Sequence, residues 1–189
     1  MKHIKKIRDL LKKTPVVHIR SIKNLIGDDT YAHLLIYHMR QRKELYRITK
    51  GWYSLSDDPT LAVFCFNPSY LGLQEALSIH NLWEQESNPV ILTTKTVREG
   101  IRNMNGSNII LKRIPSSLFF GIEYKQYGNC YVPVSDIEKT FLDMLYFRQP
   151  IEKETLRLFR KRMDKKKLKR YGKRFSKDVR EKAGGMIGV

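Results

Sequence analysis

The chain has 189 residues, and its 36 Lys and Arg side chains against 19 Asp and Glu give a formal net charge of +17. Hydrophobic residues make up 41% of the sequence, which is enough for a folded core and argues against full disorder. No apolar run approaches the roughly 18 uncharged residues that span a bilayer, and charges interrupt the apolar residues of 1–13, which excludes a secretory signal. Cys65 and Cys130 alone form neither a disulfide framework nor a four-cysteine zinc site. We therefore expect a cytoplasmic protein with no membrane partner.

The basic residues concentrate at the two ends of the chain. Residues 1–56 carry 13 basic and 4 acidic side chains, a net charge of +9. Residues 57–149 carry 8 and 10, a net charge of −2, and residues 150–189 carry 15 and 5, a net charge of +10. A thermophile surface would pair such residues with Glu, which is scarce here. The distribution favours a protein that binds a nucleic acid through its ends.

Three helices are expected in the first 42 residues. Apolar residues recur at helical spacing over residues 2–13 and again over residues 19–26, where Gly27 is a suitable C-terminal stop. Asp28 and its polar neighbours can cap a third helix that continues to Arg42. The inward stripe of this third helix would consist of Ala32, Leu35, Ile36 and Met39.

A hairpin follows the third helix. Residues 45–48 indicate a strand, Lys50 and Gly51 a tight turn, and residues 52–54 the returning strand. Three helices and a hairpin in about 55 residues is the order of a winged helix-turn-helix domain. The third helix would then enter the major groove, and the hairpin would reach phosphate or a minor groove as a wing.

The face of the third helix opposite its apolar stripe is polar and aromatic, except for Leu34. Leu34 could pack on a thymine methyl group or could instead touch another helix, and helical periodicity leaves both open. From this N-terminal domain, residues 1–57, we expect DNA contacts by Arg20, Ser21, Thr30, Tyr31, His33, Leu34, Tyr37, Arg40, Gln41, Lys50 and Trp52.

The central region, residues 60–148, is expected to be a small α+β domain after a linker at residues 57–59. Its mainly antiparallel sheet would use strands at 61–66, 90–96, 108–114, 119–124 and 130–134. One helix is expected over residues 70–83, and a second would be opened by the Ser135–Glu138 capping box. We expect this region to fold by itself and, with its net charge of −2, to have little affinity for DNA.

The order of these segments resembles the AbiEi antitoxin family of type IV toxin–antitoxin systems. The resemblance rests on the strand GWYSL, the helix LGLQEALSIHNLWEQ, the strand VILTTKT and the segment VPVSDIEKTFLDML, and it covers residues 1–148. It is carried above all by residues 75–80 and 136–143. In that family a winged helix binds operator DNA and represses the operon, and the C-terminal domain counteracts a nucleotidyltransferase-like toxin. The resemblance therefore implies a repressor and antitoxin with these two partners.

An enzyme is the less favoured hypothesis. His80, Glu84, Asp136, Glu138 and Asp143 could form an acid–base site. Alternatively, Glu84, Asp136 and Asp143 could hold the metal of a nuclease if they converge. No nucleophile, phosphate loop or metal-ligand spacing accompanies them, and a helix cap and a partly buried histidine explain them more simply. We expect no catalytic residue, no metal and no cofactor.

Residues 150–189 are expected to form a basic, helical extension. Thr155, Leu156, Leu158, Phe159 and Met163 indicate a helix that packs on the centre. Leu168, Tyr171, Phe175 and Val179 suggest a second amphipathic helix, weakened by Gly172, and the alternative is a solvated basic tail. Phosphate contacts are expected from Lys166, Lys169, Arg170, Lys173 and Arg174.

The sequence thus predicts a sequence-specific transcriptional repressor that binds duplex operator DNA. The alternative is an RNA-binding or ribonucleoprotein component, since the basic end and the aromatic residues Tyr31, Tyr37, Trp52 and Tyr53 would also suit stacked bases. Winged helices often bind inverted repeats as dimers, so a homodimer remains open.

Overall fold

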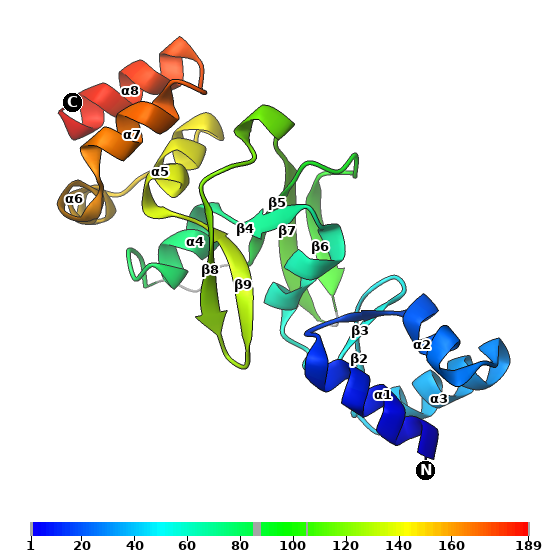
Figure 1. Cartoon of the computed structure of the whole chain (residues 1–189). Helices are drawn as coiled ribbons and strands as arrows, with labels where there is room; N and C mark the ends of the chain where they lie inside the picture. The colour runs from blue at the N-terminus through cyan, green and yellow to red at the C-terminus, as the bar shows by residue number, and fades with distance from the viewer. Residues whose placement is uncertain (1, 85–87, 105, 189) are drawn as a thin grey trace.

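The structure is a computed structural model that describes residues 2–84, 88–104 and 106–188 (Figure 1). The fold is α+β: three helices and a small sheet lie at the N-terminal end, a six-stranded sheet lies in the middle, and helices gather at the C-terminal end. None of the helices in these ranges combines the length and apolar character that crossing a membrane requires.

The N-terminal region contains the predicted helices and hairpin. The strands form a three-stranded antiparallel sheet in the order β1-β3-β2. The strand β1 was not predicted, because the sequence showed only a short apolar stretch there. The elements are α1 (Lys2–Lys13), β1 (Val17–His18), α2 (Ile19–Ile26), α3 (Asp29–Gln41), β2 (Tyr46–Thr49) and β3 (Trp52–Ser54).

The junction between α2 and α3 follows from its sequence. Gly27 ends α2 in the left-handed conformation, at φ 81°, which an L side chain rarely adopts. Asp28 then begins α3, and its carboxylate accepts a hydrogen bond from the backbone N–H of Tyr31 at 2.9 Å. The predicted inward stripe of α3 is confirmed, because its four residues are all buried: Ala32, Leu35, Ile36 and Met39.

The central region is built on a six-stranded sheet in the order β6-β7-β5-β4-β9-β8. The pairs β5–β7 and β4–β9 are parallel and the other three are antiparallel, so the sheet is mixed, and the expectation of a mainly antiparallel sheet describes it only in part. The elements are η1 (Pro59–Phe66), β4 (Ser69–Leu71), α4 (Leu73–Ile79), β5 (Val90–Thr93), β6 (Gly100–Met104), β7 (Ser107–Arg113), η2 (Ser116–Leu118), β8 (Ile122–Tyr127), β9 (Cys130–Ser135) and α5 (Ile137–Tyr146).

Two predictions for the start of this region were wrong. Residues 61–66 form the 3₁₀ helix η1 instead of a strand, because Asp58 caps the backbone N–H of Thr60 and Pro59 occupies the first turn. The linker expected at 57–59 is accordingly the cap of a buried helix. Residues 70–83 are divided between β4 and α4, since the chain pairs with β5 and β9 before the helix begins.

Apart from β6, the later elements of the central region lie closer to their predicted positions. The strand predicted at 119–124 lies at 122–127, and the edge strand β6 was not predicted at all. The helix α5 is capped by Asp136, whose side chain accepts from the backbone N–H of Lys139, and not by Ser135. Ser135 is instead the last residue of β9, and its hydroxyl lies 2.7 Å from that of Thr140.

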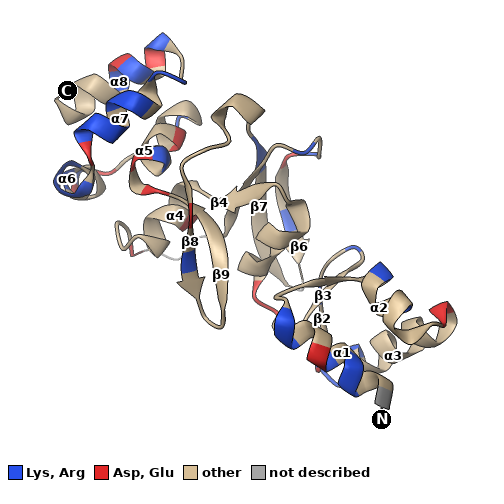
Figure 2. Ribbon diagram, viewed as in Figure 1, with Lys and Arg blue, Asp and Glu red and all other residues tan. Residues whose placement is uncertain are grey.

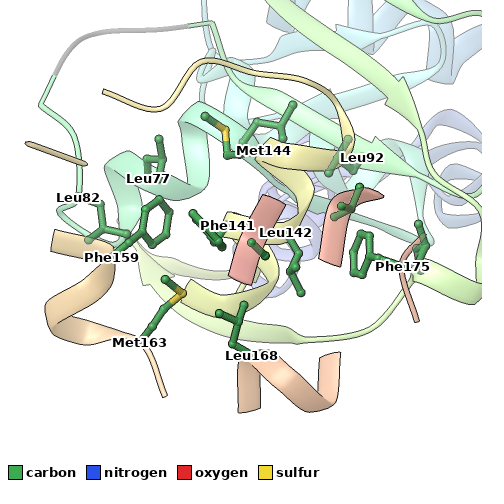
Figure 3. Close-up of a cluster of buried hydrophobic side chains, with 14 of the residues drawn as sticks. Leu77, Leu82, Leu92, Phe141, Leu142, Met144, Phe159, Met163, Leu168 and Phe175 are labelled. Carbon is green, nitrogen blue, oxygen red and sulfur yellow. The ribbon is translucent and has the colours of Figure 1, made fainter. Parts of the chain in front are cut away.

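The C-terminal region forms three helices, α6 (Lys153–Arg162), α7 (Lys165–Gly172) and α8 (Lys177–Ile187). The single second helix that the apolar spacing suggested is therefore two helices, and the alternative of a solvated basic tail is not observed. The buried side chains of these helices belong to the same core as α4 and α5 (Figure 3). The boundary at residue 150 thus separates two stretches of sequence that share one core. The shared residues include Phe141, Leu142, Phe159, Met163, Leu168, Phe175, Val179, Ala183 and Ile187.

The N-terminal region is attached to the centre by apolar contacts. Val16 and Ile48 are buried in a cluster with residues of η1 and the central sheet, and Trp52 packs against it. Met104, at the end of β6, belongs to the same cluster. These contacts fix the β2–β3 hairpin against one edge of the central sheet.

Candidate nucleic-acid interface

The outer face of α3 is exposed as the sequence predicted. Leu34 is 48% exposed and Tyr37 is 56% exposed. Leu34 belongs to none of the hydrophobic clusters of the described residues, so the alternative in which it packs on another helix is not observed. The other predicted side chains of this helix are also exposed: Thr30, Tyr31, His33, Arg40 and Gln41.

The recognition face is the exposed surface of α3 formed by Thr30, Tyr31, His33, Leu34, Tyr37, Arg40 and Gln41, and its helix is held at both ends. Near the first turn, Lys23 of α2 forms an ion pair with Asp29 at 2.6 Å, and the ring of His3 in α1 packs edge-on against Tyr31. After the last turn, Glu44 forms an ion pair with Arg8 of α1 at 3.0 Å. The helix therefore presents its outer side chains on a fixed support.

The hairpin tip is more closely held than the sequence suggested. Lys50 is exposed at the turn, and Gly51 has φ 79°, where an added Cβ would lie 3.0 Å from the ring of His18. Trp52 is half-buried, packs edge-on against His18 with ring centroids 5.0 Å apart, and touches the central cluster. Trp52 therefore anchors the hairpin, and a DNA contact by its exposed part stays a prediction. Arg20 is exposed at the start of α2, next to Ser21, which is also exposed.

A hollow of about 400 Å³ lies between the C-terminal half of α3 and β2. The sequence analysis did not identify it, because its walls come from two elements whose relative position is set by the fold. Its lining mixes aromatic rings with polar and basic side chains: Tyr37, Arg40, Gln41, Leu45, Tyr46 and Arg47.

The C-terminal helices carry a second basic surface at the other end of the molecule (Figure 2). All five predicted phosphate-binding residues here are exposed, and the guanidinium of Arg174 stacks on the ring of Phe120 at 4.4 Å from its centroid. We call this set the α7 basic surface: Lys166, Lys169, Arg170, Lys173 and Arg174.

Lys167, on the same helix, has a different role. Its Nζ lies 2.8 Å from Glu138 and 3.1 Å from Asp136 at the start of α5, and these two carboxylates raise the pKa of its ammonium group above the ordinary value. Asp136 also accepts a hydrogen bond from the hydroxyl of Tyr171 at 3.0 Å, and Glu138 accepts one from the backbone N–H of Asp164 at 2.8 Å. The carboxylates thus attach α7 to α5.

Of the remaining candidates for an acid–base site, His80 is also engaged in the fold. The ring of His80 lies 2.7 Å from the backbone carbonyl of Ser135, and burial lowers its pKa. Glu84 is exposed. In residues 2–84, 88–104 and 106–188, no three His, Cys, Asp or Glu side chains are grouped so that they could hold a metal ion.

Asp143 belongs to a buried polar cluster that the sequence analysis missed. It forms an ion pair with Lys139 one turn earlier on α5, and both side chains are fully buried. The hydroxyl of Tyr70 donates to Asp143 at 2.8 Å, and the Lys139 ammonium lies over the rings of Tyr70, Phe120 and Phe175. Burial raises the pKa of the Asp143 carboxyl and lowers that of Lys139. Only the i,i+4 spacing of opposite charges could have indicated this pair.

Comparison with known proteins adds information on the fold. No protein-family model matches the chain, and no curated protein matches it. Among solved structures, the chain is similar to the crystal structure of the Rv2827c protein from Mycobacterium tuberculosis, with a TM-score of 0.64 and 12% sequence identity. The similarity covers 100% of this chain and 77% of the other. At this identity it concerns the α+β fold alone.

Proposed function

We propose that the protein is a sequence-specific DNA-binding regulator of transcription. Its N-terminal region would act as a winged helix-turn-helix domain, with α3 in the major groove and the β2–β3 hairpin as the wing. The observation that carries the proposal is the recognition face itself: a capped, 13-residue helix that buries one stripe and exposes hydrogen-bonding and aromatic side chains on the other. A helix of this kind fits the major groove of duplex DNA.

The chemistry of the recognition face suits base reading. Gln41 can form paired hydrogen bonds with adenine, and Arg40 can do so with guanine. Leu34 offers an apolar contact for a thymine methyl group, and the exposed Tyr37 can reach a base edge or a phosphate. Lys50 on the hairpin would contact phosphate without reading sequence.

The resemblance to AbiEi antitoxins extends the proposal to the biological role. Binding at the promoter of its own operon would repress transcription, and the central region would bind a nucleotidyltransferase-like toxin. The charge distribution agrees with this division, because the central residues carry a net charge of −2 between two basic ends.

RNA binding is the second candidate, and it now depends mainly on the α7 basic surface. Of the four aromatic residues proposed to stack on bases, Tyr31 and Tyr37 are exposed, but Trp52 is half-buried and Tyr53 is only 8% exposed. A single-strand platform would need its aromatic faces accessible.

The test begins with selection of a preferred duplex from random DNA, followed by binding measurements on that duplex, on random duplex DNA, on duplex RNA and on single strands. Leu34→Ala and Tyr37→Ala should each weaken binding to the preferred duplex by about 1–3 kcal/mol and leave random DNA nearly unaffected. Lys50→Ala should weaken both alike. The matched control is Tyr124→Ala, since Tyr124 is 69% exposed on β8 and outside the proposed interface.

One outcome would reject the proposal, and another would reject the role assigned to Tyr37. Tighter binding to duplex RNA or to single strands than to any duplex DNA would favour the second candidate. Equal losses on preferred and random DNA for Tyr37→Ala would remove that residue from base recognition.

A further inference from the structure

A second hollow, of about 380 Å³, lies where the N-terminal region meets the central sheet. Residues of α3, of the β2–β3 hairpin and of β6 line it together. Ile48 and Met104 are part of this lining, are only 2% and 5% exposed, and belong to one hydrophobic cluster. The two regions are therefore packed together at the base of the hollow, and its walls have a fixed relative position.

Four cationic side chains line this hollow, which we call the notch. They are Arg40 from the last turn of α3, Arg47 from β2, Lys50 from the hairpin turn, and Arg102 from β6. Arg40, Lys50 and Arg102 form no salt bridge with a carboxylate of the described residues. Like charges gathered around one hollow repel one another unless an anion lies between them.

Arg102 is the most pre-organised of the three. It is half-buried, its Nη2 donates a hydrogen bond to the backbone carbonyl of Arg98 at 2.7 Å, and its guanidinium lies 5.7 Å from the centre of the Phe66 ring. A guanidinium has five N–H donors, so these contacts orient the group and leave further donors for a ligand. Its planar fork matches two oxygens of a phosphate.

We propose that this notch binds a backbone phosphate of the same DNA duplex that the recognition face reads, with Arg102 of the central region as a phosphate-binding residue. The inference rests on the proposed function. Arg40 links the two sites, because it lies one helical turn after Tyr37 on the recognition face and also lines the notch. A phosphate held there would lie next to the groove that α3 enters. The contact would come from a region whose overall charge gives no attraction to DNA.

The test uses the full-length chain with Arg102→Gln, because Arg40 and Lys50 already belong to the proposed N-terminal interface. Arg113→Gln is the matched control: Arg113 is an exposed arginine on β7, whose pairing places it at the opposite end of the β6–β7 hairpin from Met104. Loss of one phosphate contact should lower the slope of log affinity against log salt by about 0.9 in magnitude. We expect affinity at about 0.1 M salt to fall roughly 5- to 10-fold on preferred and random duplexes alike. The preference between the two should be unchanged.

Three results distinguish failure of the notch proposal, failure of the proposed function, and binding of a free anion. If wild type binds duplex DNA and Arg102→Gln matches Arg113→Gln in affinity and slope, the notch does not hold a DNA phosphate, whereas the proposed function stands. If wild type shows no salt-dependent duplex binding, the proposed function itself fails. If inorganic phosphate raises the melting temperature of wild type above that in sodium chloride of equal ionic strength, and Arg102→Gln loses this effect but not DNA affinity, the notch binds a free anion instead. Arg102→Lys should recover part of the affinity by restoring the charge without the fork.

Discussion

Replacing Phe159 by Ala tests whether the C-terminal helices are part of the central core. Phe159 lies on α6, is 0% exposed, and packs edge-on against Phe141 of α5 with ring centroids 5.1 Å apart (Figure 3). A buried aromatic side chain removes about 150 Å² or more from water, which at about 25 cal/mol per Å² corresponds to roughly 4 kcal/mol. Core Phe→Ala substitutions cost about 3–5 kcal/mol. We expect the free energy of unfolding to fall by about 4 kcal/mol.

The control substitution lies on the same helix. Arg157→Ala removes an ion pair with Glu154 whose atoms are 3.7 Å apart and whose side chains are about four-fifths exposed, so its cost should stay below about 1 kcal/mol. Urea unfolding of both variants would be followed by far-ultraviolet circular dichroism and by the fluorescence of Trp83, which packs against the same core. The measurements would be made in a Trp52→Phe background, so that Trp83 is the only tryptophan.

The reasoning is refuted if Phe159→Ala costs less than about 1 kcal/mol. It is also refuted if helical signal is lost at low urea while the fluorescence of Trp83 does not change, because the helices would then unfold separately. Residues 60–148 alone lack the buried residues that α6, α7 and α8 add to the core. This fragment should therefore be destabilised, contrary to the expectation from sequence that it folds by itself.

Two further predictions concern charge. Glu75 is buried in the first turn of α4, and burial together with nearby Asp58 raises the pKa of its carboxyl from 4.5 to about 7. Because the folded chain holds this proton more tightly than the unfolded chain, the stabilisation is full below about pH 4.5 and is lost as the pH rises through about 7. Urea titrations across that range should show a fall of up to about 3 kcal/mol that Glu75→Gln removes, and an unchanged fall in the variant would contradict the assignment. On the α7 basic surface, changing Lys166, Lys169 and Arg170 together to Gln should weaken binding to preferred and random duplexes by similar factors and flatten the salt dependence, whereas wild-type affinity and slope would assign the surface to another partner.

The sequence predicted local structure well where a clear helical period or a capping residue is present. In α3, the inward stripe and the exposed face followed from helical period alone, and Asp28 and Gly27 marked its boundaries with α2. Residues 61–66 were misread because an unbroken apolar run has no period, and burial on all sides suits a short helix as well as a strand. The edge strand β6 was missed for the opposite reason, since only Met104 of its five residues is buried.

The candidate site was predictable only within single elements. The exposed residues of α3 could be chosen from their spacing, but Trp52 could not be placed, because its partners lie in β1 and in the central cluster. Arg102 was not selected because the chain separates it by about 50 residues from the hairpin that it faces, and only the fold brings the two together. The buried pair of Lys139 and Asp143 escaped notice since lysine is almost never fully buried.

The two basic ends of the sequence remain two separate ends in space. The N-terminal region and the helices α6–α8 lie on opposite sides of the central sheet, with basic residues on both (Figure 2). One duplex could contact both surfaces only by running along the central region, and Arg102 would be its first contact there. The extent of the DNA footprint therefore distinguishes two arrangements. If one duplex spans the molecule, neutralising the α7 basic surface should shorten the footprint on one side of the preferred site. Arg102→Gln should then weaken protection of the DNA between the recognition face and the α7 basic surface. If the footprint keeps its full length in the α7 variant, α7 binds a different polyanion, and the notch at β6 marks the end of the DNA-binding surface.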